Sequence, residues 1–182
     1  MIDYVTPALI ARLFPNPPDD AIVVTEPLPI DSTMEAVGID FAGTRFLVFF
    51  ADVMAYAGND PDFVRETAVA WNNGFIPAPG SRIVKFLRAG ADRDTMFDPR
   101  AWPLPEPDMI WQFMEVLAVA VEGHALAFPA VRQYFYAPQN GKLDSLYNRM
   151  SRRFARGEFG ASFRCVTRPA TDEGGFYGFE RI

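Results

Sequence analysis

The chain has 182 residues, of which 49% are hydrophobic and 22% are charged, a composition typical of soluble globular proteins. Its formal net charge of −6 argues against a nucleic-acid-binding protein, because such proteins use a basic surface to neutralise phosphates. The single cysteine, Cys165, excludes an internal disulfide framework and fits a reducing compartment. We therefore expect one domain over residues 1–182, located in the cytoplasm.

The N-terminal third predicts one short helix, one strand and a hairpin. Thr6 and Pro7 suit the N-cap and first position of a helix over residues 7–14. The β-branched run 21–25 predicts a strand. A hairpin is expected at about 35–50, because alternating apolar residues precede a tight turn at 42–44 and a continuous apolar run.

The middle of the chain predicts a second helix and one ambiguous segment. Asn59 to Asp62 supply a cap, a first-turn proline and a first-turn acid for a helix that runs to about Asn72. Its apolar stripe contains Phe63, Val64, Thr67, Ala68 and Trp71. Residues 81–90 fit either a helix or a strand.

Residues 106–122, with the sequence EPDMIWQFMEVLAVAVE, predict a central buried helix. Prolines precede this segment and Gly123 follows it, which are ordinary start and stop signals. Its polar residues fall within one narrow stripe and the remaining surface is apolar; they are Asp108, Gln112, Glu115 and Glu122. The same polar residues make a membrane span a poor interpretation.

The C-terminal third predicts strands at 131–137, 162–168 and 176–181 and an amphipathic helix at 142–156. Strands and helices do not alternate strictly, so the fold class is α+β rather than α/β. We expect a small, mostly antiparallel sheet whose hairpin and C-terminal strands pack on the central helix and on amphipathic helices.

Charge is unevenly distributed along the chain. Residues 1–60 hold nine acids and two bases, a net of −7, whereas residues 121–182 hold six acids and nine bases, a net of +3. This polarity fits a homodimer, a charged protein partner or a chance distribution. If the explanation is a charged protein partner, an acidic face of this chain would meet a basic surface of the partner. The residues of that acidic face would be Asp19, Asp20, Glu26, Asp31 and Glu35.

Four arginines share one face of the predicted helix at 142–156, and two more alternate along the strand that follows; they are Arg149, Arg152, Arg153 and Arg156, then Arg164 and Arg168. Guanidinium groups bind phosphates and carboxylates through a planar bidentate fork, so these arginines are candidates for anion or partner binding. The commoner interpretation of such a run is a solvated face that is partly paired with the protein's own acids.

Glu115, Glu122 and His124 form a possible polar site. The two glutamates lie two helical turns apart, about 10 Å, which is too far to share a proton. His124 follows Gly123, where it suits an interaction with the end of the helix. We expect the glutamates to lie near Arg132 or near the arginines of residues 149–156.

No motif for catalysis, metal binding or cofactor binding is present in the sequence. One histidine and one cysteine exclude a structural zinc site, and the chain has neither a phosphate-binding glycine loop nor a nucleophile elbow. Tyr134, Tyr136 and Tyr177 could stack on nucleobases, but the overall acidity favours an aromatic protein interface.

Two hypotheses follow for function. The first is a non-catalytic protein-binding module, of the bacterial immunity or inhibitor type, with a charge-segregated surface that contains aromatic residues. The alternative is a small enzyme or ligand-binding domain for an anionic molecule, anchored by Arg149, Arg152, Arg153 and Arg156.

Overall fold

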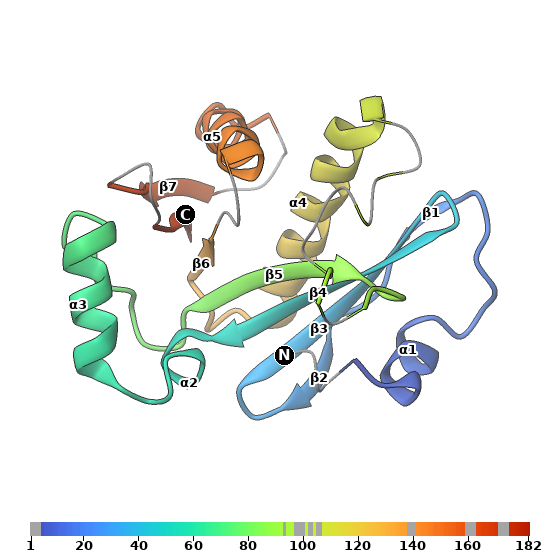
Figure 1. Cartoon of the computed structure of the whole chain (residues 1–182), viewed down its shortest axis with the longest axis horizontal. Helices are drawn as coiled ribbons and strands as arrows, with labels where there is room; N and C mark the ends of the chain where they lie inside the picture. The colour runs from blue at the N-terminus through green and yellow to red at the C-terminus, as the bar shows by residue number, and fades with distance from the viewer. Residues whose placement is uncertain are drawn as a thin grey trace. The chain divides into compact units, whose positions relative to one another are not determined.

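The computed structural model describes residues 5–92, 94–96, 101, 104, 107–137, 141–158, 163–170 and 175–182. These residues form helices and eight strands that pair mostly antiparallel, which confirms the predicted α+β class (Figure 1). They group into two compact units, one drawn from Met1–Phe49 and Phe86–Ala127 and the other from Phe50–Lys85 and Phe128–Ile182. The single domain expected from the sequence stays a prediction.

The first unit begins with helix α1 (Pro7–Leu13), whose N-cap Thr6 accepts a hydrogen bond of 3.1 Å from the backbone N–H of Leu9. Strands β1 (Ile22–Val24) and β2 (Leu28–Asp31) both pair antiparallel with β3 (Met34–Phe41). The sequence did not predict β2, because Pro29 lies within it and proline is tolerated only where its missing N–H is not needed by the sheet.

The predicted hairpin joins β3 to β4 (Thr44–Asp52). Its two-residue turn places Ala42 at φ 49° and Gly43 at φ 77°. Positive φ at both positions is the type I′ turn, whose twist matches that of the strands it connects. Every residue of β3 is buried, so this strand lies inside the first unit.

Helix α4 (Ile110–Ala127), which follows the 3-10 turn Pro107–Met109, packs against β3 and β1. Phe113 anchors it, with its ring centroid 5.5 Å from that of Phe41 and 4.6 Å from that of Phe46. The helix continues through Gly123, so the predicted end near residue 122 is wrong. His124 and Ala125 are buried, and their packing outweighs the cost of about 1 kcal/mol for a glycine inside a helix.

Helix α4 is also the one described helix with the length and apolar composition of a membrane span, although half of that span is buried within the protein. Core helices of folded domains meet the same criteria. The predicted helix start at Glu106 lies outside the described residues.

The second unit contains α2 (Val53–Tyr56), α3 (Pro61–Trp71), β5 (Arg82–Arg88), β6 (Gln133–Tyr136), α5 (Gly141–Ala155), β7 (Phe163–Thr167) and β8 (Tyr177–Arg181). Strand β4 begins in the first unit and ends in the second, whereas β5 begins in the second unit and ends in the first. The strands of this unit follow the order β4-β5-β6-β8-β7. Strand β5 pairs parallel with β6, whereas β6–β8 and β7–β8 are antiparallel.

The ambiguous segment 81–90 is therefore a strand over most of its length. Its neighbour β6 is buried along its whole length and supplies aromatic side chains to the core of the second unit. Tyr134 meets Phe163 edge-to-face at 5.8 Å, and Tyr136 meets Phe179 at 5.8 Å.

Candidate functional site in the second unit

Helix α3 has the cap that its sequence predicts. The carboxylate of Asp60 accepts hydrogen bonds from the backbone N–H groups of Asp62 (2.9 Å) and Phe63 (3.1 Å), and Pro61 occupies the first position. The helix ends before Asn73 and Gly74, whose φ values of 54° and 78° turn the chain out of the helix. These signals fix where α3 begins and where it ends.

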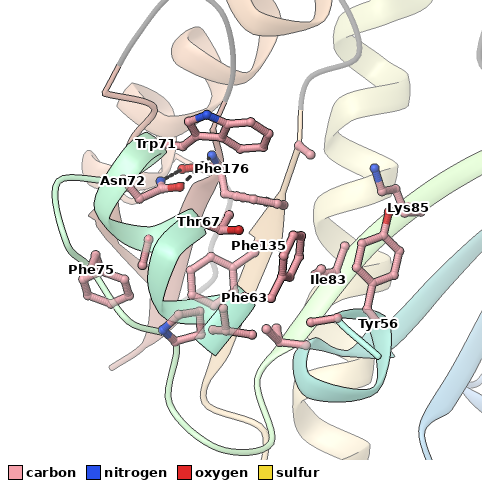
Figure 2. A pocket seen from close by; sticks show the side chains of 16 residues that line it. Tyr56, Phe63, Thr67, Trp71, Asn72, Phe75, Ile83, Lys85, Phe135 and Phe176 are labelled. Carbon is pink, nitrogen blue, oxygen red and sulfur yellow. Dashed lines mark hydrogen bonds between the residues drawn. The ribbon is translucent and has the colours of Figure 1, made fainter. Parts of the chain in front are cut away.

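That stripe is not fully covered by the core. Of its five predicted members only Ala68 is buried, and the side chains of Phe63 and Trp71 are 54% and 47% exposed. All five line a cavity of about 290 Å³ whose remaining walls come from α2, β5, β6 and the segments around Phe75 and Phe176 (Figure 2).

The wall of the cavity is built from apolar side chains. Val53, Ile83 and Phe135 form a buried cluster, against which three partly buried residues pack; these are Val64, Phe75 and Phe176. Tyr56, which is 50% exposed, joins Phe63 and Trp71 as a third half-exposed aromatic residue of the lining. Aromatic side chains of this kind supply large contact areas at binding sites.

Asn72 closes one end of the cavity by tying the end of α3 to the chain before β8. Its amide nitrogen donates to the carbonyl oxygen of Phe176 (2.7 Å), and its amide oxygen accepts from the N–H of the same residue (3.3 Å; Figure 2). A further hydrogen bond of 3.3 Å reaches the hydroxyl of Thr167. Asn72 is thus committed to shaping the cavity rather than to binding a ligand.

Lys85 is the one cationic side chain among the residues that line the cavity. The residue is 8% exposed, and its Nζ atom lies 6.0 Å from the centroid of the Tyr56 ring. Burial lowers the pKa of the Lys85 ammonium below its usual range. Within the described part of the chain, no hydrogen bond or ion pair reaches this ammonium group.

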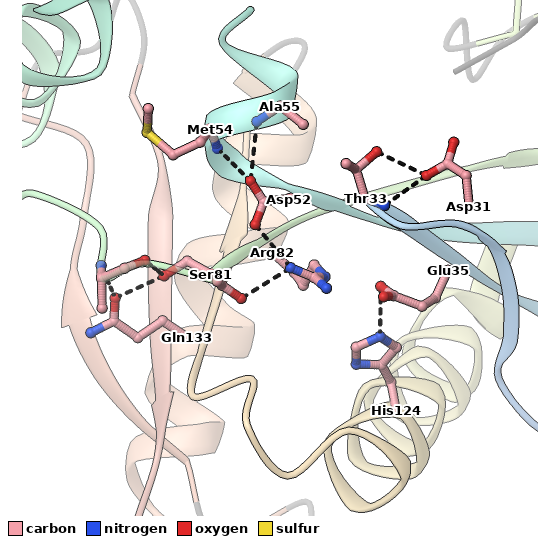
Figure 3. Close-up of polar contacts among 12 residues, drawn as sticks. Asp31, Thr33, Glu35, Asp52, Met54, Ala55, Ser81, Arg82, His124 and Gln133 are labelled. Atoms are coloured by element: carbon pink, nitrogen blue, oxygen red, sulfur yellow. Dashed lines mark hydrogen bonds and ion pairs between the residues drawn. The ribbon is translucent and has the colours of Figure 1, made fainter. Parts of the chain in front are cut away.

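A set of hydrogen bonds holds the elements that carry Tyr56 and Lys85 (Figure 3). Asp52 caps α2 by accepting from the N–H groups of Met54 (2.9 Å) and Ala55 (3.1 Å), and it pairs with Arg82 of β5 at 3.1 Å. The acid that ends β4 therefore fixes both the start of α2 and the start of β5.

Gly178 of β8 lies directly behind the cavity wall. A Cβ atom at this position would sit 2.7 Å from Cε1 of Phe135 and 2.7 Å from Cγ2 of Thr167. Only glycine leaves room for the Phe135 ring in its observed place, so the absence of a side chain at residue 178 fixes the position of this part of the cavity wall.

The predicted arginines are distributed over the second unit and do not line this cavity. Arg153 and Arg156 both pair with Glu158, at 2.8 and 2.6 Å, and the hydrogen bond from Arg153 is the main cause of the lowered pKa of Glu158. Arg164 hydrogen-bonds to Glu180 (Nε to Oε2, 2.9 Å), and this bond lowers the pKa of that carboxyl. The other three candidates are exposed; they are Arg149, Arg152 and Arg168.

The five acids of the predicted partner face do not share one environment. Four are exposed; they are Asp19, Asp20, Glu26 and Asp31. Glu35 is buried and its Oε2 atom lies 3.2 Å from Nε2 of His124, so its assignment to an exposed face is wrong (Figure 3). His124 is likewise inside α4 rather than beyond its end, because the helix continues to Ala127.

Glu115 is exposed and Glu122 is half-buried on α4. Their predicted proximity to Arg132 or to the arginines of residues 149–156 joins residues of different units and stays a prediction. The proposed stacking tyrosines are unsuitable for surface contact, because all three are buried; they are Tyr134, Tyr136 and Tyr177.

The sequence did not point to Tyr56, Lys85, Phe135 or Phe176 as residues of one site. The available signal was Lys85 itself, a charged residue inside the otherwise apolar run IVKFL of β5. A charged residue within a buried strand requires a local explanation. No cluster of three potential metal-ligating side chains occurs among the residues that the structure describes.

Comparison of the chain with protein-family models, with curated proteins and with solved structures finds no match. Function is therefore argued from the geometry of the cavity.

Proposed function

We propose that this protein is a non-catalytic binding protein, located in the cytoplasm, whose ligand is a small molecule with an apolar body. The observation that supports this proposal most strongly is the cavity beside α3, about 290 Å³ in volume and lined mainly by aromatic and aliphatic side chains. Concave apolar pockets with few polar groups are the usual form of small-molecule sites.

The chemistry of the lining favours binding over catalysis. Its polar side chains are Tyr56, Thr67, Asn72 and Lys85, and the amide of Asn72 is engaged with Phe176. General acid–base or nucleophilic catalysis uses a reactive group that is positioned by a second one. The lining supplies apolar contact area instead.

Half-exposed Trp71 gives a direct test, because its fluorescence reports on contacts made inside the cavity. Trp102 and Trp111 also emit, so the Trp71 signal is taken as the difference between the wild-type protein and Trp71→Phe. We expect 1-octanol to change this fluorescence saturably and to raise the melting temperature. Phe63→Asp, which places a charge on the lining, should abolish both effects. The matched control is Val69→Asp, on the same helix, because Val69 is 66% exposed and does not line the cavity.

Equal responses of the two aspartate variants would show that octanol binds elsewhere. The absence of any saturable response in the wild-type protein would refute the proposed function.

A second function, docking of a protein partner in the manner of an immunity or inhibitor protein, is supported by a separate observation. Asp19, Asp20, Glu26 and Asp31 are all exposed in the first unit, and the first 60 residues carry a net charge of −7. Exposed acids steer association with a basic surface. Anion binding by the arginines of α5 has less support, because Arg153 and Arg156 already pair with Glu158.

The docking function is tested by affinity capture from the native host at low salt with wild-type protein and with Asp19→Lys/Asp20→Lys. We expect a stoichiometric basic partner that the double variant loses. Capture of a second copy of the chain would identify a homodimer instead, and equal capture by both proteins would refute a role for these acids.

A further inference from the structure

Lys85 is a buried cation without a described anionic partner. The residue is 8% exposed, and its ammonium group lies over the face of the Tyr56 ring, 6.0 Å from Nζ to the ring centroid. A buried charge is normally paired, because removal of an ammonium group from water costs several kcal/mol. A single cation–π contact offsets about 0.5–2 kcal/mol of that cost.

The same residue borders the apolar cavity. Lys85 lines it together with Ile83, and Tyr56 lies beside Lys85 in the close-up view, at the side away from Trp71 and Asn72 (Figure 2). A ligand that reaches from Trp71 toward Tyr56 would therefore present its apolar body to α3 and Phe135 and its far end to Lys85.

We propose that the ligand of the cavity is an amphipathic carboxylate, with an aliphatic or aromatic body in the apolar part and its carboxylate at Nζ of Lys85. This inference rests on the proposed function, since it assigns a chemical class to the molecule that the cavity binds. The carboxylate supplies the charge that the described residues do not, and the apolar walls strengthen the ion pair by excluding water.

A carboxylate fits this site better than a phosphate. The described lining has one cation, which balances one negative charge, whereas a phosphate carries nearly two charges and three strong acceptor oxygens. Phosphate sites usually combine arginine forks or several backbone N–H groups. A monovalent head group requires neither.

The test compares three probes that share one eight-carbon chain and differ in charge: octanoate, 1-octanol and octylammonium. Each is titrated at neutral pH into the wild-type protein and into Lys85→Met, with isothermal calorimetry and Trp71 fluorescence as readouts. Methionine keeps the length of the side chain and removes its charge. The variant is expected to fold because it relieves a buried cation, and circular dichroism with a thermal melt checks this.

We expect the wild-type protein to bind octanoate at least about tenfold more tightly than octanol, because a hydrogen bond to a charged group contributes that much. Octylammonium should bind most weakly. Lys85→Met should lose the preference for octanoate while it keeps the affinity for octanol.

Equal affinities for octanoate and octanol in the wild-type protein would overturn the carboxylate assignment and leave the proposed function intact. Failure of all three probes to bind would instead remove the proposed function. If Lys85→Met does not fold, the nuclear magnetic resonance signal of the Lys85 ε-methylene group in the wild-type protein decides. In that case octanoate should shift the signal of the ε-methylene group, because its charged carboxylate lies beside the ammonium group, whereas octanol should not.

Discussion

In the first unit, a buried polar contact joins the side chains of Glu35 of β3 and His124 of α4. Both side chains are almost fully buried, and their nearest atoms lie 3.2 Å apart. Buried polar groups stabilise a fold only while they remain paired. This contact therefore fixes the position of α4 on β3 through chemistry as well as through packing.

Replacement of one member should be costly. We expect His124→Leu to lower the free energy of unfolding by about 3 kcal/mol, because it leaves the Glu35 carboxyl buried without this contact. Urea denaturation measures the change. Glu26→Gln is the control, since Glu26 is exposed and its substitution should change stability by less than about 0.5 kcal/mol. Equal stability of the wild type and His124→Leu would mean that the contact contributes nothing.

Residue-scale features were predictable from sequence when their cause is local. The caps at Thr6 and Asp60 follow from their own segments, and the structure has both. The Glu35–His124 contact joins residues that are 89 positions apart, so no periodicity or spacing could reveal it. The same reason explains why Lys85 could not be placed beside Tyr56.

At the scale of elements, the hairpin turn between β3 and β4 contains a local mismatch. Ala42 adopts φ 49°, a left-handed conformation that costs a residue with a Cβ atom about 1–2 kcal/mol. Asparagine tolerates this conformation better, and Asn-Gly is the preferred type I′ pair. The strands on either side are buried, and their packing holds the turn despite the strain.

We accordingly expect Ala42→Asn to raise the free energy of unfolding by about 0.5–1 kcal/mol. Differential scanning calorimetry would detect this as a higher melting temperature. Gly43→Ala should have the opposite effect, because it adds a Cβ atom at φ 77°. A loss of stability in Ala42→Asn would show that alanine makes a contact that outweighs its strain.

Strand β8 controls the cavity through Gly178. We expect Gly178→Ala to lower the free energy of unfolding by about 1–3 kcal/mol and to weaken octanol binding, because the new methyl group displaces the Phe135 ring that walls the cavity. Thermal melts and Trp71 fluorescence measure the two effects.

The control for Gly178→Ala is Gly123→Ala, near the C-terminal end of α4. A Cβ atom at residue 123 meets nothing within 4 Å, so this variant should gain up to about 1 kcal/mol from the higher helix propensity of alanine. Unchanged octanol binding in Gly178→Ala would show that Phe135 does not limit the cavity.

The elements of the cavity were mostly predictable, but the cavity was not. The sequence gives α3 and its apolar stripe correctly, and β6 and β8 are close to their predicted bounds. Periodicity identifies the face that is apolar, yet it does not say whether that face is filled by neighbours or left open. That outcome depends on the reach of Phe75, Phe135 and Phe176 from distant segments.

For the molecule as a whole, buried tyrosines should set the alkaline limit of stability. Burial raises the pKa of Tyr136, Tyr147 and Tyr177 above the usual value near 10. Above that pH the unfolded chain loses phenolic protons that the folded protein retains. Stability is therefore complete below about pH 10 and falls as the pH rises beyond it.

Urea denaturation at pH 8, 9, 10 and 11 should show this loss, and Tyr147→Phe should reduce its slope because one titrating group is removed. Tyr56→Phe is the matched control, since Tyr56 is half-exposed. Lys85 acts in the opposite direction, because its lowered pKa makes the folded protein bind fewer protons in this range, but it is common to all three proteins. Identical slopes for the wild type and Tyr147→Phe would show that Tyr147 does not contribute to the loss of stability at alkaline pH.

The two compact units are interleaved along the chain, which passes from the first to the second, back to the first and again to the second. During synthesis the first unit cannot close until Ala127 has left the ribosome, and the second must await residues near the C-terminus. Residues 50–85, with the apolar face of α3, are therefore made early and remain without β6 and β8 while more than 40 further residues are translated. Exposed apolar surface of this kind recruits chaperones during translation, so a nascent chain paused before residue 128 should be a chaperone substrate.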